Sequence, residues 1–108
     1  MYSGFFPGAV PDEQVKKERQ KARALRNSPW WKRKRGRGTC HFCGGRFKPE
    51  DLTMEHVVPL ARGGLSVKSN LVPACKTCNT KKKYLLPVEW EEYLGLLRAN
   101  DDSLGQEL

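Results

Sequence analysis

Four cysteines stand in two Cys-x-x-Cys pairs, C-H-F-C at Cys40 and Cys43 and C-K-T-C at Cys75 and Cys78. Each pair makes a tight turn that presents two thiolates to one point, and together they supply the four donors of a tetrahedral Zn²⁺. The pattern therefore predicts a closed structural zinc site. A thioredoxin-like redox pair is the alternative, but it requires a βαβ context that the sequence does not indicate. The 31 residues between the pairs exceed the spacing of a simple zinc ribbon, so this segment must have structure of its own.

The chain has 108 residues, which suits one domain, and only 38% of them are hydrophobic. A small core of this kind gains much of its stability from a metal site, on the order of 10 kcal/mol. The N-terminal M-Y-S-G-F-F-P-G-A-V lacks a basic start, and Pro7 and glycines break its apolar run, so it predicts neither a secretory signal nor a membrane span. The thiols are therefore expected in a reducing cytoplasm, where metal is favoured over disulfides.

Positive charge is concentrated in the first third of the chain. The net charge is +8, and residues 16–37 hold eleven basic residues and one acid, Glu18, whereas residues 85–108 hold one arginine and six acids. Neutralising phosphates releases condensed counterions, so the basic segment predicts nucleic-acid binding that is independent of base sequence and weakens with salt. A solvated surface or a localisation tail is the alternative.

The basic segment begins with a predicted helix at residues 11–26, which has helix formers throughout, acids in its first turn and bases after it. Its apolar stripe is thin, so we expect it to lie on DNA or at the edge of the domain. N-S-P at residues 27–29 is expected to end it, and W-W-K-R-K-R-G-R-G to form a basic loop. Trp30 and Trp31 are expected to pack over the metal subdomain rather than stack on bases.

Between the cysteine pairs, residues 52–58 carry β-branched side chains and predict a short strand that Pro59 closes. A second strand is predicted at residues 71–74, reached through A-R-G-G-L-S, where two glycines allow a sharp turn. The segment N-T-K-K-K-Y-L-L after Cys78 predicts a brief helix that ends at Pro87.

The C-terminal segment P-V-E-W-E-E-Y-L-G-L-L-R-A-N predicts an amphipathic helix. Trp90, Tyr93, Leu94 and Leu97 fall on one stripe, which is expected to pack over the zinc subdomain. Residues 101–108 are expected to fray.

Three motifs of the central segment resemble those of the HNH endonucleases, which have a ββα-metal fold. They are E-H-V-V-P-L-A-R-G-G (55–64), S-N-L-V-P-A-C (69–75) and C-N-T-K-K (78–82), framed by the two cysteine pairs that many members use for structural zinc. The resemblance covers residues 39–87, and the order and spacing of the motifs make it more specific than any one of them. It implies an α+β fold with a small ββα-metal (HNH) core, clasped by a zinc site of four cysteines and flanked by N- and C-terminal helices.

The resemblance also implies roles for four residues. His56 falls on the general base, and Glu55 falls on the acidic ligand of the catalytic metal. Asn70 falls on the asparagine that steadies the loop and the histidine, and Asn79 on the second metal ligand. Two positions depart from the common pattern, because many members have Asp where Glu55 stands and His where Asn79 stands.

The chemistry of these side chains agrees with those roles. Hydrolysis of a phosphodiester needs a base to activate water and a cation to neutralise charge on the phosphate and the departing 3' oxygen. An imidazole titrates in a range suited to the first task, and Glu55 and Asn79 offer hard oxygen donors for Mg²⁺ or Mn²⁺. Asn79 in place of histidine should favour Mg²⁺ over softer ions, and the longer Glu55 should place the cation farther out and favour the larger Mn²⁺.

Glu55 and His56 are neighbours on a predicted strand, where adjacent side chains point to opposite faces. The two side chains cannot both face one cleft squarely. We therefore expect the metal beside the end of the strand, where twist or a bulge lets one side chain reach around and the helix brings Asn79 across.

Each residue also has an ordinary structural explanation. His56 would fit a core, Glu55 an exposed strand position, Asn79 a helix N-cap and Asn70 a turn. These explanations do not account for the order of the motifs inside a zinc-clasped basic domain, which favours the nuclease. The other class that stays open is a non-catalytic zinc-containing module that binds nucleic acid.

Basic side chains around the predicted site are expected to hold DNA phosphates, although a solvated helix face explains the lysines almost as well. They are Arg33, Lys34, Arg35, Arg37, Arg62, Lys81, Lys82 and Lys83. Nothing in the sequence marks an element that reads bases, so the sequence does not indicate which DNA sequence or modification would be recognised.

Three parts are expected: a basic helical extension at residues 1–27, a zinc-stabilised HNH core at residues 28–87, and an amphipathic helix with a tail at residues 88–108. The expected function is a divalent-metal-dependent endonuclease that hydrolyses DNA and leaves 3' hydroxyl and 5' phosphate ends, as the family does. Its cofactors would be structural Zn²⁺ and catalytic Mg²⁺ or Mn²⁺. Its expected partner is DNA, and no interaction with a membrane is expected. A double-strand cut would need a second copy of the chain or a larger nuclease or packaging assembly. Restriction, phage packaging and mobile elements all stay open as settings.

Overall fold

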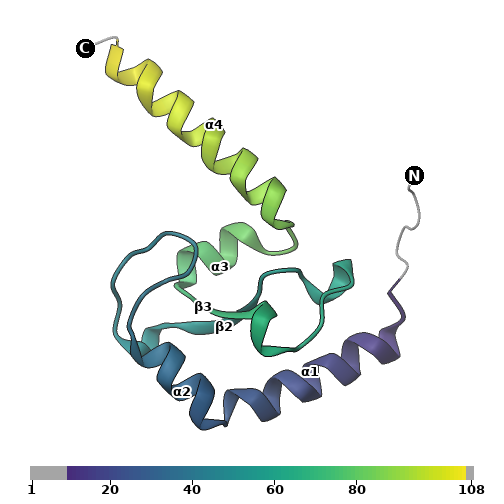
Figure 1. Cartoon of the computed structure of the whole chain (residues 1–108). Helices are drawn as coiled ribbons and strands as arrows, with labels where there is room; N and C mark the ends of the chain where they lie inside the picture. The colour runs from purple at the N-terminus through teal and green to yellow at the C-terminus, as the bar shows by residue number, and fades with distance from the viewer. Residues whose placement is uncertain (1–9, 107–108) are drawn as a thin grey trace.

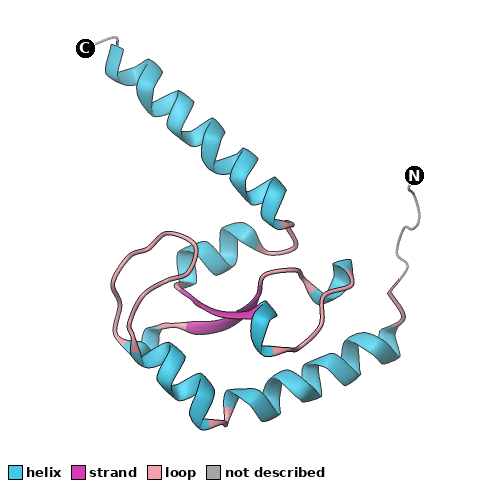
Figure 2. Cartoon of the chain, in the orientation of Figure 1, coloured by secondary structure: helices cyan, strands magenta, loops and turns pink. Residues whose placement is uncertain are grey.

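A pair of short antiparallel strands lies at the centre of the molecule (Figure 1). In the computed structural model, which describes residues 10–106, they are β2 (Thr53–His56) and β3 (Leu71–Ala74). β3 coincides with the predicted second strand, and all four of its side chains are buried. Figure 2 shows how little of the described chain is strand, since helices and loops make up the rest. The predicted α+β class and the order strand, turn, strand, helix are confirmed.

β2 is shorter than the predicted strand of residues 52–58. After His56, the amide of Val57 still donates a hydrogen bond to the backbone carbonyl of Asn70, at 2.9 Å. The amide of Val58 donates instead to the side-chain oxygen of Asn70, at 2.8 Å. The pairing thus passes from the backbone to a side chain, and the regular strand ends there.

Two helices precede the strands, α1 (Asp12–Arg26) and α2 (Pro29–Gly36). α1 matches the predicted N-terminal helix. The basic loop predicted after it is wrong, because the residues that end α1 also start α2. The Ser28 hydroxyl caps α2 by accepting a hydrogen bond from the Trp31 amide at 3.3 Å, and proline suits the first helical position. α2 buries Trp31 and contacts β3.

The connection between β2 and β3 contains 3₁₀ turns at Leu60–Arg62 and Lys68–Asn70, and a third such turn, Pro49–Asp51, precedes β2. The turn predicted at the two adjacent glycines is present. Gly64 packs so closely there that a Cβ would lie 1.8 Å from the carbonyl oxygen of Val58. The connection therefore folds back tightly onto the end of β2.

α3 (Lys76–Lys82) begins three residues earlier than predicted, and it ends before the predicted Y-L-L segment. Its start is set by Cys75, whose sulfur accepts a hydrogen bond from the Cys78 amide at 3.5 Å and so caps the helix. Its end is set by Lys83, which has a φ of +40°. α3 contacts β2, and it holds the second cysteine pair with Cys75 at its N-cap and Cys78 in its first turn.

α4 (Pro87–Gln106) is the longest helix of the described chain and projects away from the strands (Figure 1). It continues through residues 101–106, which were expected to fray; residues 107–108 lie outside the described part. This projection raises the radius of gyration to 16.2 Å, above the value of about 13 Å for a compact domain of 100 residues. No helix in residues 10–106 is long and apolar enough to cross a bilayer.

The core forms around three of the four cysteines rather than inside the sheet. It packs the inner turns of α4 against the cysteine pairs, with Phe42, Leu85, Tyr93 and Leu94 half-buried around it. Its buried members are Cys40, Leu52, Ala74, Cys75, Cys78 and Trp90. The predicted stripe on α4 is confirmed for Trp90, Tyr93 and Leu94, whereas Leu97 is exposed. Trp31 is buried and Trp30 is half-buried, but neither is among the residues packed around the cysteines, so the prediction that they pack over the metal subdomain is wrong.

Candidate active site and metal centre

The two cysteine pairs converge on one point. The four sulfur atoms of Cys40, Cys43, Cys75 and Cys78 all lie within 4.8 Å of one another. Four thiolates around a tetrahedral Zn²⁺ with bonds of about 2.3 Å would lie about 3.8 Å apart, so the arrangement fits such an ion. The thiols are therefore positioned to bind a metal, consistent with the predicted structural zinc.

Backbone amides are aimed at these sulfurs. Cys75 donates to the Cys40 sulfur at 3.4 Å, and Gly45 donates to the Cys43 sulfur at 3.4 Å. Gly44, in the first turn, has a φ of +72°, which glycine adopts without strain. Hydrogen bonds of this kind favour the thiolate form that a metal requires. Three of the cysteines are buried and Cys43 is exposed.

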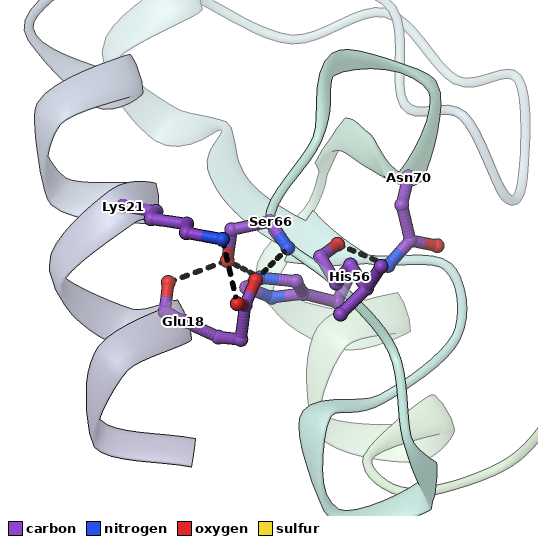
Figure 3. A network of polar contacts seen from close by, with 6 residues as sticks. Glu18, Lys21, His56, Ser66 and Asn70 are labelled. Atoms are coloured by element: carbon purple, nitrogen blue, oxygen red, sulfur yellow. Dashed lines mark hydrogen bonds and ion pairs between the residues drawn. The ribbon is translucent and has the colours of Figure 1, made fainter. Parts of the chain in front are cut away.

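The imidazole of His56 points toward Ser66 and the N-terminal helix α1 (Figure 3). Its Nε2 lies 2.8 Å from the hydroxyl oxygen of Ser66, and the side chain is half-buried. Desolvation lowers the pKa of His56, the negative charge of Glu18 opposes this shift, and the nearby Arg26 and Lys82 add to it. The imidazole is therefore favoured in its neutral form, which a general base requires.

The carboxylate of Glu55 folds onto the backbone of its own strand, at the next residue. Its Oε1 accepts a hydrogen bond from the His56 amide at 2.9 Å. Desolvation raises the pKa of Glu55, while the His56 amide and the charge of Lys82 lower it. A half-buried carboxylate of this kind is costly to ionise unless a cation lies nearby.

Asn79 lies on α3 against the start of β2. Its side-chain nitrogen donates to the hydroxyl of Thr53 at 3.1 Å, which leaves the amide oxygen as the end available to a cation. Thr53 and Glu55 share one face of β2 and stand about 6.6 Å apart along it. The structure thus brings Asn79 to the same side of the strand as Glu55, while the imidazole of His56 leaves from the other side. This is the divergence expected from the alternation of side chains.

Asn70 holds the connection beside the histidine in place. Besides accepting from Val58, its side chain donates to the carbonyl oxygens of Val58 at 3.1 Å and Leu65 at 2.8 Å. One amide group therefore ties both arms of the loop to the end of β2. This position agrees with the loop-steadying role implied for Asn70, and it involves no contact with a reacting group.

Lys82 does not fit the phosphate-binding role predicted for it. Its side chain is fully buried, and the ammonium donates to the carbonyl oxygens of His56 at 3.2 Å and Leu85 at 3.1 Å. It also lies 5.3 Å from the centre of the Phe42 ring. Burial lowers the pKa of Lys82, and Glu55 opposes that shift. The prediction fails because α3 turns this lysine inward.

The other predicted DNA contacts differ in exposure. Arg62 is engaged by α4, since it donates to Glu89 at 3.1 Å and to the carbonyl oxygen of Tyr84 at 3.2 Å. Lys34 lies over the ring of Trp30, 5.2 Å from its centre, and Arg35 is half-buried. Arg62 is nevertheless exposed, and the other side chains open to solvent are Arg33, Arg37, Lys81 and Lys83.

Two residues beside His56 were not predicted, Ser66 and Glu18. Each has 4% of its surface exposed. Sequence spacing gives no signal for a contact across 48 residues. One indication was present in hindsight, because Glu18 is the single acid in a strongly basic segment.

Comparison with protein families finds a match in the central part of the chain. Residues 40–92 match a family model described as HNH endonuclease. The match begins at Cys40, the first cysteine of the cluster, and ends in the first turns of α4. A search of curated proteins gives no match to the chain.

Proposed function

We propose that the protein hydrolyses phosphodiester bonds of DNA, because residues 40–92 match the HNH endonuclease family. His56 is the general base, Asn70 supports it, and one divalent cation assists. The 3' oxygen leaves, so the products are a 3' hydroxyl and a 5' phosphate. One such site cuts one strand, and cutting both strands requires a second copy or a larger assembly.

The observation that carries this proposal is the environment of His56. The ring is half-buried, one nitrogen is held by Ser66 at 2.8 Å, and burial lowers its pKa. An imidazole that is neutral near pH 7 and fixed at one nitrogen can accept a proton from water at the other.

Glu55 and Asn79 are the residues that would hold the catalytic cation. Both offer oxygen donors, which suit Mg²⁺ or Mn²⁺, and both lie on the α3 side of β2. The cation would supply charge neutralisation at the phosphate and at the departing oxygen. The desolvated carboxylate of Glu55 supports this assignment, because a bound cation would add to the stabilisation that Lys82 already gives its ionised form.

The exposed basic residues supply the attraction for DNA. Arg33 and Arg37 on or beside α2, and Lys81 and Lys83 at the end of α3, remain open to solvent. The exposed bases of α1 add to this charge, including Lys16, Lys17, Arg19, Arg23 and Arg26. Contacts of this kind bind the phosphate backbone without reading bases.

A plasmid-nicking assay tests the proposal. Supercoiled DNA is incubated with the zinc-loaded protein and Mg²⁺ or Mn²⁺, using wild type, His56→Ala and His41→Ala. His41 is the matched control, because it is the other histidine of the chain and is exposed on the first cysteine turn. Loss of a general base lowers the rate by about 10²- to 10⁴-fold, so nicking should vanish only in His56→Ala, and DNA binding should survive.

The same assay separates the proposal from its alternative. Equal nicking by wild type and His56→Ala would indicate a contaminating nuclease and contradict the assigned base. DNA binding without nicking under either metal would favour the non-catalytic zinc module.

A further inference from the structure

Glu18 of α1 holds Ser66 at two points (Figure 3). The Ser66 amide donates to Oε1 of Glu18 at 2.6 Å, and the Ser66 hydroxyl donates to the backbone carbonyl oxygen of Glu18 at 2.5 Å. The other carboxylate oxygen of Glu18 accepts from Lys21 at 3.0 Å. Both Glu18 and Ser66 are buried. These contacts fasten α1 to the loop that lies beside the predicted base.

The Ser66 hydroxyl lies between the backbone carbonyl of Glu18 and Nε2 of His56, and it has one proton for these two contacts. A serine hydroxyl has one proton to donate and can accept hydrogen bonds with its lone pairs. The proton of Ser66 lies in the 2.5 Å contact, because two oxygens cannot approach so closely without a shared hydrogen. The 2.8 Å contact with His56 must then be one in which Nε2–H donates and Ser66 accepts.

The other ring nitrogen follows from this count. A neutral imidazole carries one N–H, so protonation at Nε2 leaves Nδ1 with a free lone pair. Figure 3 shows that the side of the ring that meets Ser66 faces α1. The contact thus selects one of the two neutral tautomers and fixes the direction of the remaining lone pair.

We propose that Ser66, held by Glu18, is a positioning residue for His56: it fixes the Nε2–H tautomer, so that Nδ1 accepts the proton of the attacking water. This inference rests on the proposed function for its catalytic consequence, but the tautomer itself does not. Neither Ser66 nor Glu18 touches the reacting atoms. Glu18 lies on α1, outside the residues that match the family model, so the working nuclease includes the N-terminal helix.

The tautomer can be measured in the wild-type protein without any assay of cutting. Nitrogen-15 NMR of the zinc-loaded protein at pH 7.5 distinguishes a protonated from an unprotonated ring nitrogen. The expected result is a protonated Nε2 and an unprotonated Nδ1 for His56. A spectrum with the proton on Nδ1, or with both tautomers averaged, would overturn the proposal even if every variant failed to fold.

Variants then test the consequence for catalysis. Ser66→Ala removes the acceptor, and misoriented supporting groups typically lower activity by about 10- to 100-fold. We expect that loss in kcat with little change in KM for DNA, together with mixed tautomers at His56. Ser66→Thr keeps the hydroxyl and should restore both readouts. Ser69→Ala is the matched control, because Ser69 is an exposed serine of the same loop.

The outcomes separate the two proposals. If wild type does not cut DNA, the proposed function fails, while the NMR result still decides whether Ser66 fixes the tautomer. If Ser66→Ala and Ser69→Ala cut equally fast and His56 keeps its Nε2 proton in both, Ser66 has no positioning role.

Discussion

The ammonium group of Lys82 donates a hydrogen bond to the backbone carbonyl oxygen of His56 at 3.2 Å, from a side chain with no exposed surface. A buried lysine is stable only when its charge and its donors are satisfied. Here the second donor goes to Leu85 at 3.1 Å, and Glu55 supplies the opposing charge. The end of α3 is thereby joined to the strand residue that carries the proposed base.

Replacing this lysine should destabilise the fold. Lys82→Met fills a similar volume but leaves two buried carbonyl oxygens without a donor, which costs about 1–3 kcal/mol. Lys81→Met, at the exposed neighbouring position, is the matched control and should change stability by less than about 0.5 kcal/mol. Urea unfolding of the zinc-loaded proteins measures both. Equal stability of the two variants would show that the buried ammonium contributes nothing.

The same pair of lysines should behave in the opposite way toward DNA. Each phosphate contact contributes about 0.9 to the slope of log K against log salt concentration. We expect Lys81→Met to lower this slope and Lys82→Met to leave it unchanged, because only Lys81 reaches solvent. Fluorescence anisotropy with a labelled duplex at several salt concentrations measures it. A lower slope in Lys82→Met would restore the phosphate-binding role for that residue.

Gly64 should tolerate no side chain. A Cβ at this position would meet the Val58 carbonyl oxygen at 1.8 Å, so Gly64→Ala must displace the loop backbone. Overpacking of this kind costs about 1–3 kcal/mol or more. Gly95→Ala provides the contrast, since it points into open space within α4 and should stabilise the helix by about 0.5–1 kcal/mol. Thermal unfolding followed by circular dichroism checks both directions.

Removal of the two metals should have separable effects. Omission of Mg²⁺ and Mn²⁺ from the zinc-loaded protein should stop nicking while the circular dichroism spectrum stays native, and added Mg²⁺ or Mn²⁺ should restore nicking. A strong zinc chelator should unfold the protein, because structural zinc contributes on the order of 10 kcal/mol. Helical signal that persists after the zinc content reaches zero would show that the cysteine cluster is not essential for the fold.

The contribution of Glu18 to stability should depend on pH in a defined direction. The Ser66 amide, and then Lys21, hold the pKa of Glu18 below its ordinary value. A carboxyl group with a lowered folded-state pKa stabilises fully above its unfolded value of about 4.3, and it loses that contribution as pH falls through the folded value.

Comparison with Glu18→Gln measures this effect. The difference in unfolding free energy between wild type and Glu18→Gln should be constant from pH 8 to pH 6 and shrink below about pH 4.5. Glu13→Gln, an exposed acid in the first turn of α1, is the control for a general change of charge. A difference that grows on acidification would contradict the assigned direction.

The parts of the fold that local chemistry determines were predictable from the sequence. The cysteine spacing predicted the cluster, and the glycine turn that precedes residues 71–74 helped to predict β3. Errors arose where one residue type serves two purposes. N-S-P can end one helix and begin another, and Cys75 is both a metal donor and the cap of α3.

The rest depended on packing between distant segments. Nothing in the local pattern distinguishes Lys82, which faces inward, from Lys81, which faces solvent. In the same way, Glu18 looks like one more surface residue of a charged helix until α1 is placed against the loop that carries Ser66. Contacts of this kind can be seen only in the three-dimensional structure. The residues are far apart in the sequence, and their separation follows neither a helical nor a strand periodicity.

The exposure of Cys43, beside three buried partners, gives the metal centre one vulnerable side. Oxidants and competing ligands reach a thiolate in proportion to its accessibility. Peroxide would therefore oxidise this sulfur first, and a soft metal such as Cd²⁺ would bind to it first. Loss of the bound ion would then release α3 and α4 together. The redox state of the cell would then set how long each molecule stays folded.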